Sequence, residues 1–254
     1  MTIAPQLPYQ SLPVNMAGTD YFVGDIHGQF SKLHEALLEA GFRFEVDRVI
    51  SVGDLVDRGE QSIWAEQWLK MSYFYAVRGN HEELYLTWYA LRHDRDSQKT
   101  FEQDIYFPNG GKWVTKTDEE THHRLSKMFL QLPYLLTVPS TTGKLVGAVH
   151  AGLPDGASWP QMIAENLTPS RIEDMIWSRN RLLYQFKDKK AKRVWDEGVV
   201  PGLDAVVCGH VIVPQVTWAG KFCYIETAGW KKGGHFSIVP MPHILDMAKT
   251  KGIY

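Results

Sequence analysis

A strand-like run that ends in glycine and a polar residue, followed by a helical pattern, occurs three times within the first hundred residues. Gly24-Asp25, Gly53-Asp54 and Gly79-Asn80 follow β-rich runs over residues 21–23, 48–52 and 73–77. Apolar residues at helical spacing come next, over residues 30–40, 63–71 and 82–92. This β-α-β-α-β order predicts a parallel sheet with right-handed crossovers, and therefore an α/β fold.

The rest of the chain predicts further strands but no second domain. Short β-rich runs return over residues 145–149, 205–207, 222–227 and 235–239, whereas residues 94–142 are polar and predict helices and loops. Residues 1–19 contain three prolines and no periodicity, so we expect an extended N-terminal arm. Because no Gly-, Pro- or Ser-rich linker divides the remainder, residues 20–254 are predicted to form a single domain.

Composition excludes several classes of protein. The 27 Lys and Arg residues against 29 Asp and Glu residues give a net charge of −2, which disfavours a nucleic-acid partner because phosphate-driven binding needs a cationic excess. The two cysteines form no CxxC pair, so a disulfide scaffold is excluded. Without a signal-peptide pattern or a run of about eighteen apolar residues, we expect a cytoplasmic protein with no membrane partner.

Histidine and carboxylate side chains follow the ends of five predicted strands. The first three junctions supply Asp25, His27, Asp54, Asp57, Arg58, Asn80 and His81, and two later junctions supply His150 and His210. In open parallel sheets the site lies at the carboxyl ends of the strands, so these side chains are expected to converge.

Six of these residues offer oxygen or nitrogen donors that suit Mn²⁺, Fe or Zn²⁺ better than Ca²⁺. They are Asp25, His27, Asp54, Asn80, His150 and His210. Six ligands are too many for one ion that must keep an open position. They suffice for two ions bridged by one carboxylate, an arrangement that phosphoesterases use.

The same segments resemble the signature blocks of the calcineurin-like metallophosphoesterases. The blocks are Gly24-Asp25-Ile26-His27-Gly28, Gly53-Asp54-Leu55-Val56-Asp57-Arg58-Gly59, Arg78-Gly79-Asn80-His81-Glu82, His150-Ala151-Gly152 and Gly209-His210. Within that superfamily the chain most resembles the bacterial and phage serine/threonine protein phosphatases of the lambda phosphatase type. Asn109-Gly110-Gly111-Lys112-Trp113 and Ile176-Trp177-Ser178-Arg179 support that choice. The resemblance implies a β-α-β-α-β core within a two-sheet β-sandwich flanked by helices.

The resemblance also implies a role for each site residue. Asp25 and His27 would hold a first divalent metal ion and Asp54 would bridge to a second. Asn80, His150 and His210 would hold the second ion, with Mn²⁺ expected and Fe or Zn²⁺ as alternatives. A hydroxide bridging the ions would attack phosphorus in line. Arg58 and Arg179 would bind the phosphoryl oxygens, His81 would protonate the leaving alkoxide, and Asp57 would orient His81.

The expected activity is that of a metal-dependent phosphoprotein phosphatase acting on phosphorylated proteins or small phosphomonoesters. Two alternatives stay open: a dinucleoside polyphosphate hydrolase on the same metal site, and a non-enzymatic scaffold that binds phosphoproteins. Diadenosine tetraphosphate hydrolases typically carry Ala in place of Asp57 and Asp in place of Glu82, so both positions favour the phosphatase. The complete set of ligands and arginines disfavours the scaffold. The basic stretch over residues 187–193 is expected to be a solvated face.

Overall fold

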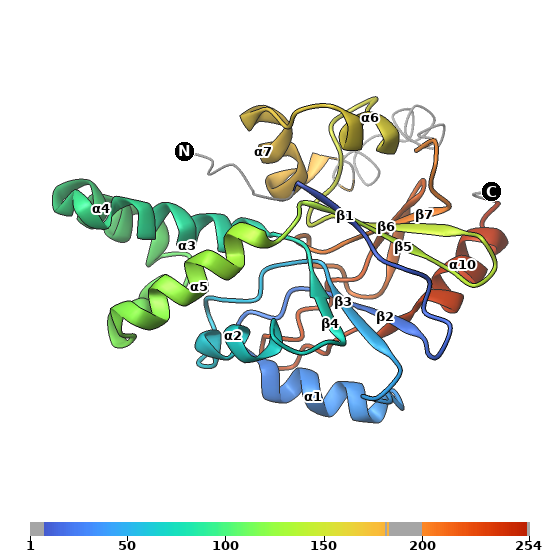
Figure 1. Cartoon of the computed structure of the whole chain (residues 1–254), viewed down its shortest axis with the longest axis horizontal. Coiled ribbons are helices and arrows are strands. Elements are labelled where there is room, and N and C mark those ends of the chain that lie inside the picture. Colours follow the sequence, from blue (N-terminus) through green and yellow to red (C-terminus); the bar gives the residue numbers. More distant parts are fainter. Residues whose placement is uncertain (1–7, 181, 183–199, 253–254) are drawn as a thin grey trace.

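The computed structural model describes residues 8–180, 182 and 200–252, and the basic stretch over residues 187–193 therefore lies outside the described residues. Two β-sheets pack face to face, and helices cover their outer faces (Figure 1). The predicted α/β class and the two-sheet sandwich are both confirmed.

The four-stranded sheet contains the three strands that the repeated pattern predicts. Its order is β10-β2-β3-β4, with β10 at Val239–Pro240, β2 at Asp20–Val23, β3 at Arg48–Ser51 and β4 at Phe74–Ala76. Strands β2, β3 and β4 are parallel, as predicted, and β10 is antiparallel to β2. The helical segments that connect them are α1 (Phe30–Glu39) and a short η1–α2 pair (Ser62–Trp64 and Ala65–Trp68), and α3 (Asn80–Ala90) follows β4.

The six-stranded sheet is mixed, and half of its strands were not predicted. Its order is β1-β5-β6-β7-β9-β8, with β1 at Tyr9–Ser11, β5 at Leu135–Pro139, β6 at Leu145–Ala148, β7 at Ala205–Cys208, β9 at Phe222–Tyr224 and β8 at Thr217–Ala219. The expectation of helices and loops up to residue 142 is wrong at β5. This strand shows no alternating pattern because four of its five residues are buried.

Strand β1 lies inside the segment that we expected to be an extended arm. It pairs in parallel with β5 at the edge of the sheet, where Tyr9 aligns with Leu135. The segment thus contributes a strand to the sandwich, and the proposed single domain from residue 20 onward stays a prediction.

Three apolar layers hold the sandwich together. One lies between the two sheets, where Phe22 and Ile50 meet Leu136 and Val207. A second lies between the four-stranded sheet and helices α1, α2, α3 and α5 (Glu119–Gln131), and a third lies between the six-stranded sheet and helices α6 (Trp159–Ala164) and α7 (Pro169–Trp177). Helix α10 (Met241–Thr250) closes the layer between the sheets at one end. Burial on both faces makes the strands rigid supports for their carboxyl ends.

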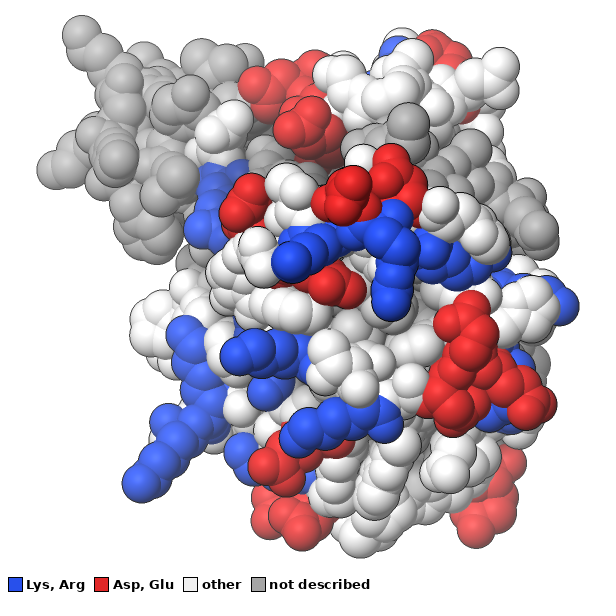
Figure 2. Space-filling model, turned by 90° about the vertical axis from the view of Figure 1, so that its left-hand side faces the viewer, with Lys and Arg blue, Asp and Glu red and all other residues white. Residues whose placement is uncertain are grey.

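The segment between β4 and β5 forms a helical arm at the left of Figure 1. After α3 it contains η2 (Leu91–His93), α4 (Arg95–Phe101), the π-helical η3 (Glu102–Tyr106), the 3₁₀-helical η4 (Gly111–Lys116) and α5. Figure 2 shows this side of the molecule, where acidic and basic side chains are interspersed. Among the described residues, no helix is long and apolar enough to cross a membrane.

Candidate active site

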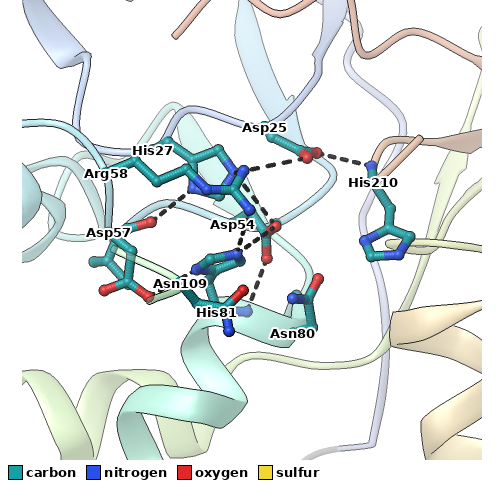
Figure 3. Close-up of polar contacts among 12 residues, drawn as sticks. Asp25, His27, Asp54, Asp57, Arg58, Asn80, His81, Asn109 and His210 are labelled. Carbon is teal, nitrogen blue, oxygen red and sulfur yellow. Dashed lines mark hydrogen bonds and ion pairs between the residues drawn. The ribbon is translucent and has the colours of Figure 1, made fainter. Parts of the chain in front are cut away.

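The predicted site residues converge where strands of the two sheets end. Asp25 and His27 follow β2, Asp54 follows β3, Asn80 and His81 begin α3 after β4, His150 follows β6, and His210 follows β7. Figure 3 shows the Asp54 side chain between His27 and Asn80, with Arg58 beside His27. The backbone N–H of His210 donates to Asp25 Oδ1 at 3.0 Å, a contact that joins the ends of the two sheets.

The backbone at this site is strained. Six described non-glycine residues have a positive φ, and five of them are predicted site residues: His27, Asp54, Asp57, Arg58 and His210, with φ between 45° and 70°. A left-handed residue other than glycine costs about 1–3 kcal/mol, so the surrounding structure must hold each one in place. Glycine permits the close approach nearby, because a Cβ at Gly79 would lie 2.3 Å from Asp54 Oδ1.

The His27 ring is held in an orientation that turns one of its nitrogens toward the Asp25 and Asp54 carboxylates. His27 Nδ1 lies 2.9 Å from the Val56 carbonyl oxygen, which can only accept, so Nδ1 carries the proton. The other nitrogen, Nε2, lies 3.6 Å from Asp54 Oδ2 and 3.9 Å from Asp25 Oδ2. Burial and the neighbouring His81 lower the pKa of His27 well below its ordinary value, so the ring is neutral and its lone pair faces the site. A backbone carbonyl behind the ring is the usual support of a metal-ligating histidine.

His150 is held in the same way on the opposite side of Asp54. Its Nδ1 donates to the Val52 carbonyl at 2.7 Å, while Nε2 lies 2.8 Å from Asn80 Oδ1 and 3.4 Å from Asp54 Oδ2. Burial lowers the pKa of His150, but the Asp54 and Asp25 carboxylates outweigh it and raise the pKa to about 9, so without a metal ion Nε2 carries a proton that faces both acceptors. A divalent cation among the three atoms would displace that proton and satisfy all of them.

The donor set therefore fits divalent metal ions. Among the described residues, two groups of side chains could each hold a metal ion, because the possible ligand atoms within a group all lie within 4.8 Å of one another. One group is His27, Asp54 and His81, and the other is Asp54, His150 and His210. Asp54 belongs to both groups, as expected for a bridging ligand. Burial, together with Glu226 and Asp54, raises the pKa of Asp25 well above its ordinary value, and a nearby cation would reverse this shift.

His81 differs from the other histidines because a carboxylate supports it. His81 Nδ1 donates to Asp57 Oδ2 at 2.7 Å, and both residues are buried. Burial lowers the pKa of His81, but the Asp54 and Asp57 carboxylates outweigh it and leave the pKa raised. Arg58 Nη2 lies 2.9 Å from His81 Nε2, so the outer nitrogen of this ring faces the Arg58 guanidinium.

Two arginines approach the site from different sides. The Arg58 guanidinium packs on the Trp230 ring at 4.5 Å and donates to His27 Nε2 at 2.5 Å. Arg179 is exposed and its Nε donates to His210 Nε2 at 3.3 Å. Beside the site, a cleft of 390 Å³ reaches Asn80 between α3, η3 and α7.

Several supporting residues were not predicted as site residues. Glu82 accepts the backbone N–H groups of Asp54, Leu55 and Gly79 at 2.7–2.9 Å, and it thereby holds the backbone of the central carboxylate. Burial and the nearby Asp54 raise the pKa of Glu82 to about 7. Glu82 belongs to the Arg78-Gly79-Asn80-His81-Glu82 block, so the sequence could have indicated that it supports the site.

Glu226 supports the opposite end of the site without a comparable sequence signal. It accepts from the Asp25 backbone at 2.8 Å and from Trp230 Nε1 at 3.1 Å. The Asp25 contact spans 201 positions in the chain, so no local pattern could have indicated it.

Comparison with known proteins identifies the family. Residues 21–214 match the family model of the calcineurin-like phosphoesterases, so the chain belongs to that family and is a hydrolase that uses divalent metal ions. The chain is 30% identical to serine/threonine-protein phosphatase 2 of Salmonella typhimurium, over 84% of this chain and 88% of that protein. It is 29% identical to serine/threonine-protein phosphatase 1 of the same organism, over 92% of this chain and 97% of that protein.

Solved structures show the same fold. A proposed diadenosine tetraphosphatase has a TM-score of 0.59 at 20% identity and covers 92% of this chain and 98% of its own. A serine/threonine phosphatase from Saccharomyces cerevisiae has a TM-score of 0.53 at 17% identity and covers 89% of this chain and 72% of its own.

Proposed function

We propose that this hydrolase is a serine/threonine protein phosphatase that cleaves phosphomonoesters. The observation that carries the proposal is the buried His81–Asp57 pair, whose imidazole Nε2 faces the arginine expected to bind phosphate. A serine alkoxide is a strong base, so its departure needs a positioned proton donor, and a carboxylate-supported histidine is suited to that task. The Salmonella relatives named as serine/threonine phosphatases support the same assignment.

In this proposal Asp25 and His27 would hold one divalent metal ion, Asn80, His150 and His210 would hold another, and Asp54 would serve both. Two divalent ions, when bound, lower the pKa of a water molecule and neutralise charge on the phosphoryl group. We propose Mn²⁺, because mixed oxygen and nitrogen donors suit it.

The remaining residues orient the substrate and move its proton. Arg58 and Arg179 bind the phosphoryl oxygens, where a planar guanidinium offers two parallel donors. His81 protonates the leaving oxygen of the serine or threonine side chain, and Asp57 holds its ring. The cleft beside Asn80 offers room for the residues that flank a phosphorylated side chain.

A dinucleoside polyphosphate hydrolase is the second candidate, favoured by the fold similarity to a proposed diadenosine tetraphosphatase. Bis(5'-nucleosyl)-tetraphosphatases also match, but over a shorter part of the chain: 42% identity over 64 residues for the protein from Shewanella loihica. Asp57 and Glu82 depart from the pattern typical of those hydrolases. Their contacts to His81 and to the Asp54 backbone give both departures a physical role.

Metal content and turnover test the proposal together. We expect the purified protein to lose turnover of a phosphoserine peptide and of p-nitrophenyl phosphate after chelation, and to recover best with Mn²⁺. The variant His150→Asn should bind less Mn²⁺, whereas His243→Asn, at an exposed position on α10, should bind as much as the unmodified protein. Full turnover in excess chelator would contradict the metal mechanism.

A further inference from the structure

The carboxylate of Asp57 has partners beyond His81. Its Oδ2 faces His81, while its Oδ1 accepts from the Trp113 indole N–H at 2.7 Å and from the Tyr106 hydroxyl at 3.1 Å. An indole nitrogen can only donate, so it fixes Oδ1 as an acceptor and with it the plane of the carboxylate. Burial raises the pKa of Tyr106 well above its ordinary value, so its hydroxyl keeps its proton and also donates.

The same segment, residues 106–113, also holds the neighbouring arginine. The Gly110 carbonyl accepts from the Arg58 backbone N–H at 3.1 Å. A Cβ at Gly110 would lie 2.6 Å from that nitrogen, and a Cβ at Gly111 would lie 2.4 Å from the Tyr106 ring. Gly110 also has a φ of 103°, which favours glycine. Glycine at position 110 therefore lets the segment lie directly on Arg58, and glycine at position 111 leaves room for the Tyr106 ring.

The segment over residues 106–113 contacts a strained stretch of backbone and is itself fixed by contacts to α3 and α5. Asp57 and Arg58 are consecutive left-handed residues, with φ of 70° and 67°. Trp113 stacks on Tyr85 of α3, with ring centroids 5.6 Å apart and an interplanar angle of 8°. His122 Nε2 of α5 lies 3.1 Å from the carbonyl oxygen of Val114, the residue after Trp113. Contacts from the helical arm thus stabilise the unfavourable backbone conformation of Asp57 and Arg58.

We propose that Tyr106 and Trp113 are positioning residues of the reaction: by fixing the Asp57 carboxylate, they aim His81 at the leaving oxygen of the substrate. This inference rests on the proposed role of His81 as general acid. Neither residue contacts a proposed metal ligand through a hydrogen bond in the described part of the chain. Their loss should therefore impair proton delivery without impairing metal binding.

Substitutions that remove only the donors provide the test. Trp113→Phe and Tyr106→Phe keep an aromatic ring in place and delete the N–H or O–H. Trp159→Phe is the matched control, because Trp159 Nε1 donates to Thr137 Oγ1 at 2.9 Å in the apolar layer under α6, away from the site. His81→Asn reports on the general acid itself. For each variant, kcat and KM are measured with a phosphoserine peptide and with p-nitrophenyl phosphate under saturating Mn²⁺, together with bound metal.

The expected pattern is selective. Trp113→Phe should lower kcat for the phosphoserine peptide by about tenfold, and the double variant by more, because a misaligned general acid loses part of its effect. For p-nitrophenyl phosphate, whose leaving group needs little protonation, kcat should change by less than about threefold. KM and bound Mn²⁺ should stay unchanged, and Trp159→Phe should show no substrate-dependent loss.

Two results would separate failure of this inference from failure of the proposed function. If His81→Asn shows the selective loss but the double variant Tyr106→Phe/Trp113→Phe does not, the positioning role is wrong and the general acid stands. If His81→Asn lowers kcat equally for both substrates, the proposed general acid is wrong, and the inference falls with it.

Discussion

The two halves of the candidate site differ in how firmly they are held. The half at the end of the four-stranded sheet is buried apart from Arg58, which is exposed: Asp54, Asp57, Asn80 and His81 are each at most 2% exposed. In the half at the end of the six-stranded sheet, His150 is buried, but His210 is partly exposed and Arg179 is exposed. We propose that the buried half aligns the reacting groups and that the open half admits the phosphate.

The two halves also differ in their hydrogen bonds, which are more numerous in the buried half. The backbone around Asp54 is fixed by Glu82, and the Asp57 carboxylate receives three side-chain donors. Arg179, by contrast, makes one described hydrogen bond, to His210. Fixed donors that need no rearrangement during the reaction are worth more than mobile ones. Variants in the buried half should therefore be the more damaging.

The largest effect is expected at Asp54, which belongs to both groups of side chains that could hold a metal ion. Asp54→Asn should lower kcat/KM for p-nitrophenyl phosphate by at least about a thousandfold, because metal-ion catalysis contributes several kcal/mol. Steady-state kinetics and bound metal per chain check this. A variant that retains the full metal content and activity would remove Asp54 from the centre of the site.

Asp57 should come next, since in the proposed mechanism it acts on the reaction through His81. Asp57→Asn should lower kcat for a phosphoserine peptide by at least about tenfold, equivalent to about 1.4 kcal/mol of transition-state stabilisation. Bound Mn²⁺ should not change, because Asp57 lies outside the proposed ligand set. Monoester hydrolysis at the unmodified rate would show that the buried pair has no part in proton transfer.

The two arginines allow a direct comparison of the halves with one type of substitution. Arg58→Lys should lower kcat/KM by about tenfold, because lysine loses the parallel donors and the stacking on Trp230. Arg179→Lys should have the smaller effect, mainly on KM, since its contacts are exposed and fewer. If Arg179→Lys proves more damaging than Arg58→Lys, the proposed division between a fixed and an open half is wrong.

The smallest effect concerns stability at the far end of the four-stranded sheet. Asp47 is buried and accepts from the Thr19 and Arg43 backbones at 2.7 and 2.8 Å. Burial raises its pKa, but these bonds and the Arg43 guanidinium outweigh it, so the pKa lies below 3.8. A lowered folded-state pKa contributes stability above pH 3.8 that disappears as the pH falls through the folded value.

Asp47→Asn should accordingly lower the Tm at pH 7, and the difference should shrink as the pH falls below 3.8. Thermal melts of both proteins across that range provide the measurement. Activity per folded molecule at pH 7 should be unchanged. A Tm difference that persists at low pH would mean that the carboxylate's charge is not what stabilises this end of the sheet.

The sequence predicted the four-stranded sheet better than the six-stranded sheet, for a physical reason. Around β2, β3 and β4, strand, turn and helix follow each other within about thirty residues, so local patterns carry the geometry. Strands β1, β5 and β8 were not predicted. Strand β1 pairs with β5 across a long stretch of chain. Strands β5 and β8 pair locally with β6 and β9, but β5 is almost wholly buried and β8 has only three residues, so neither shows an alternating pattern. His150 and His210 were found because each follows a strand run directly.

Supporting contacts were harder to predict than the ligands. Tyr106, Trp113 and Glu226 reach the site through hydrogen bonds that span 49, 56 and 201 positions. The strained backbone was also not predicted, because the residue type alone does not place His27, Asp57 and His210 at a positive φ, which few non-glycine residues adopt. Tertiary packing alone determines these features.

The central feature of the proposed mechanism is that the site supplies a proton to a strongly basic leaving group. The direct test compares kcat/KM for a phosphoserine peptide with kcat/KM for diadenosine tetraphosphate, both with Mn²⁺. A nucleotide phosphate leaves as a much weaker base and gains little from the His81–Asp57 pair. The account predicts a higher kcat/KM for the phosphoserine peptide. A clear preference for diadenosine tetraphosphate would contradict it.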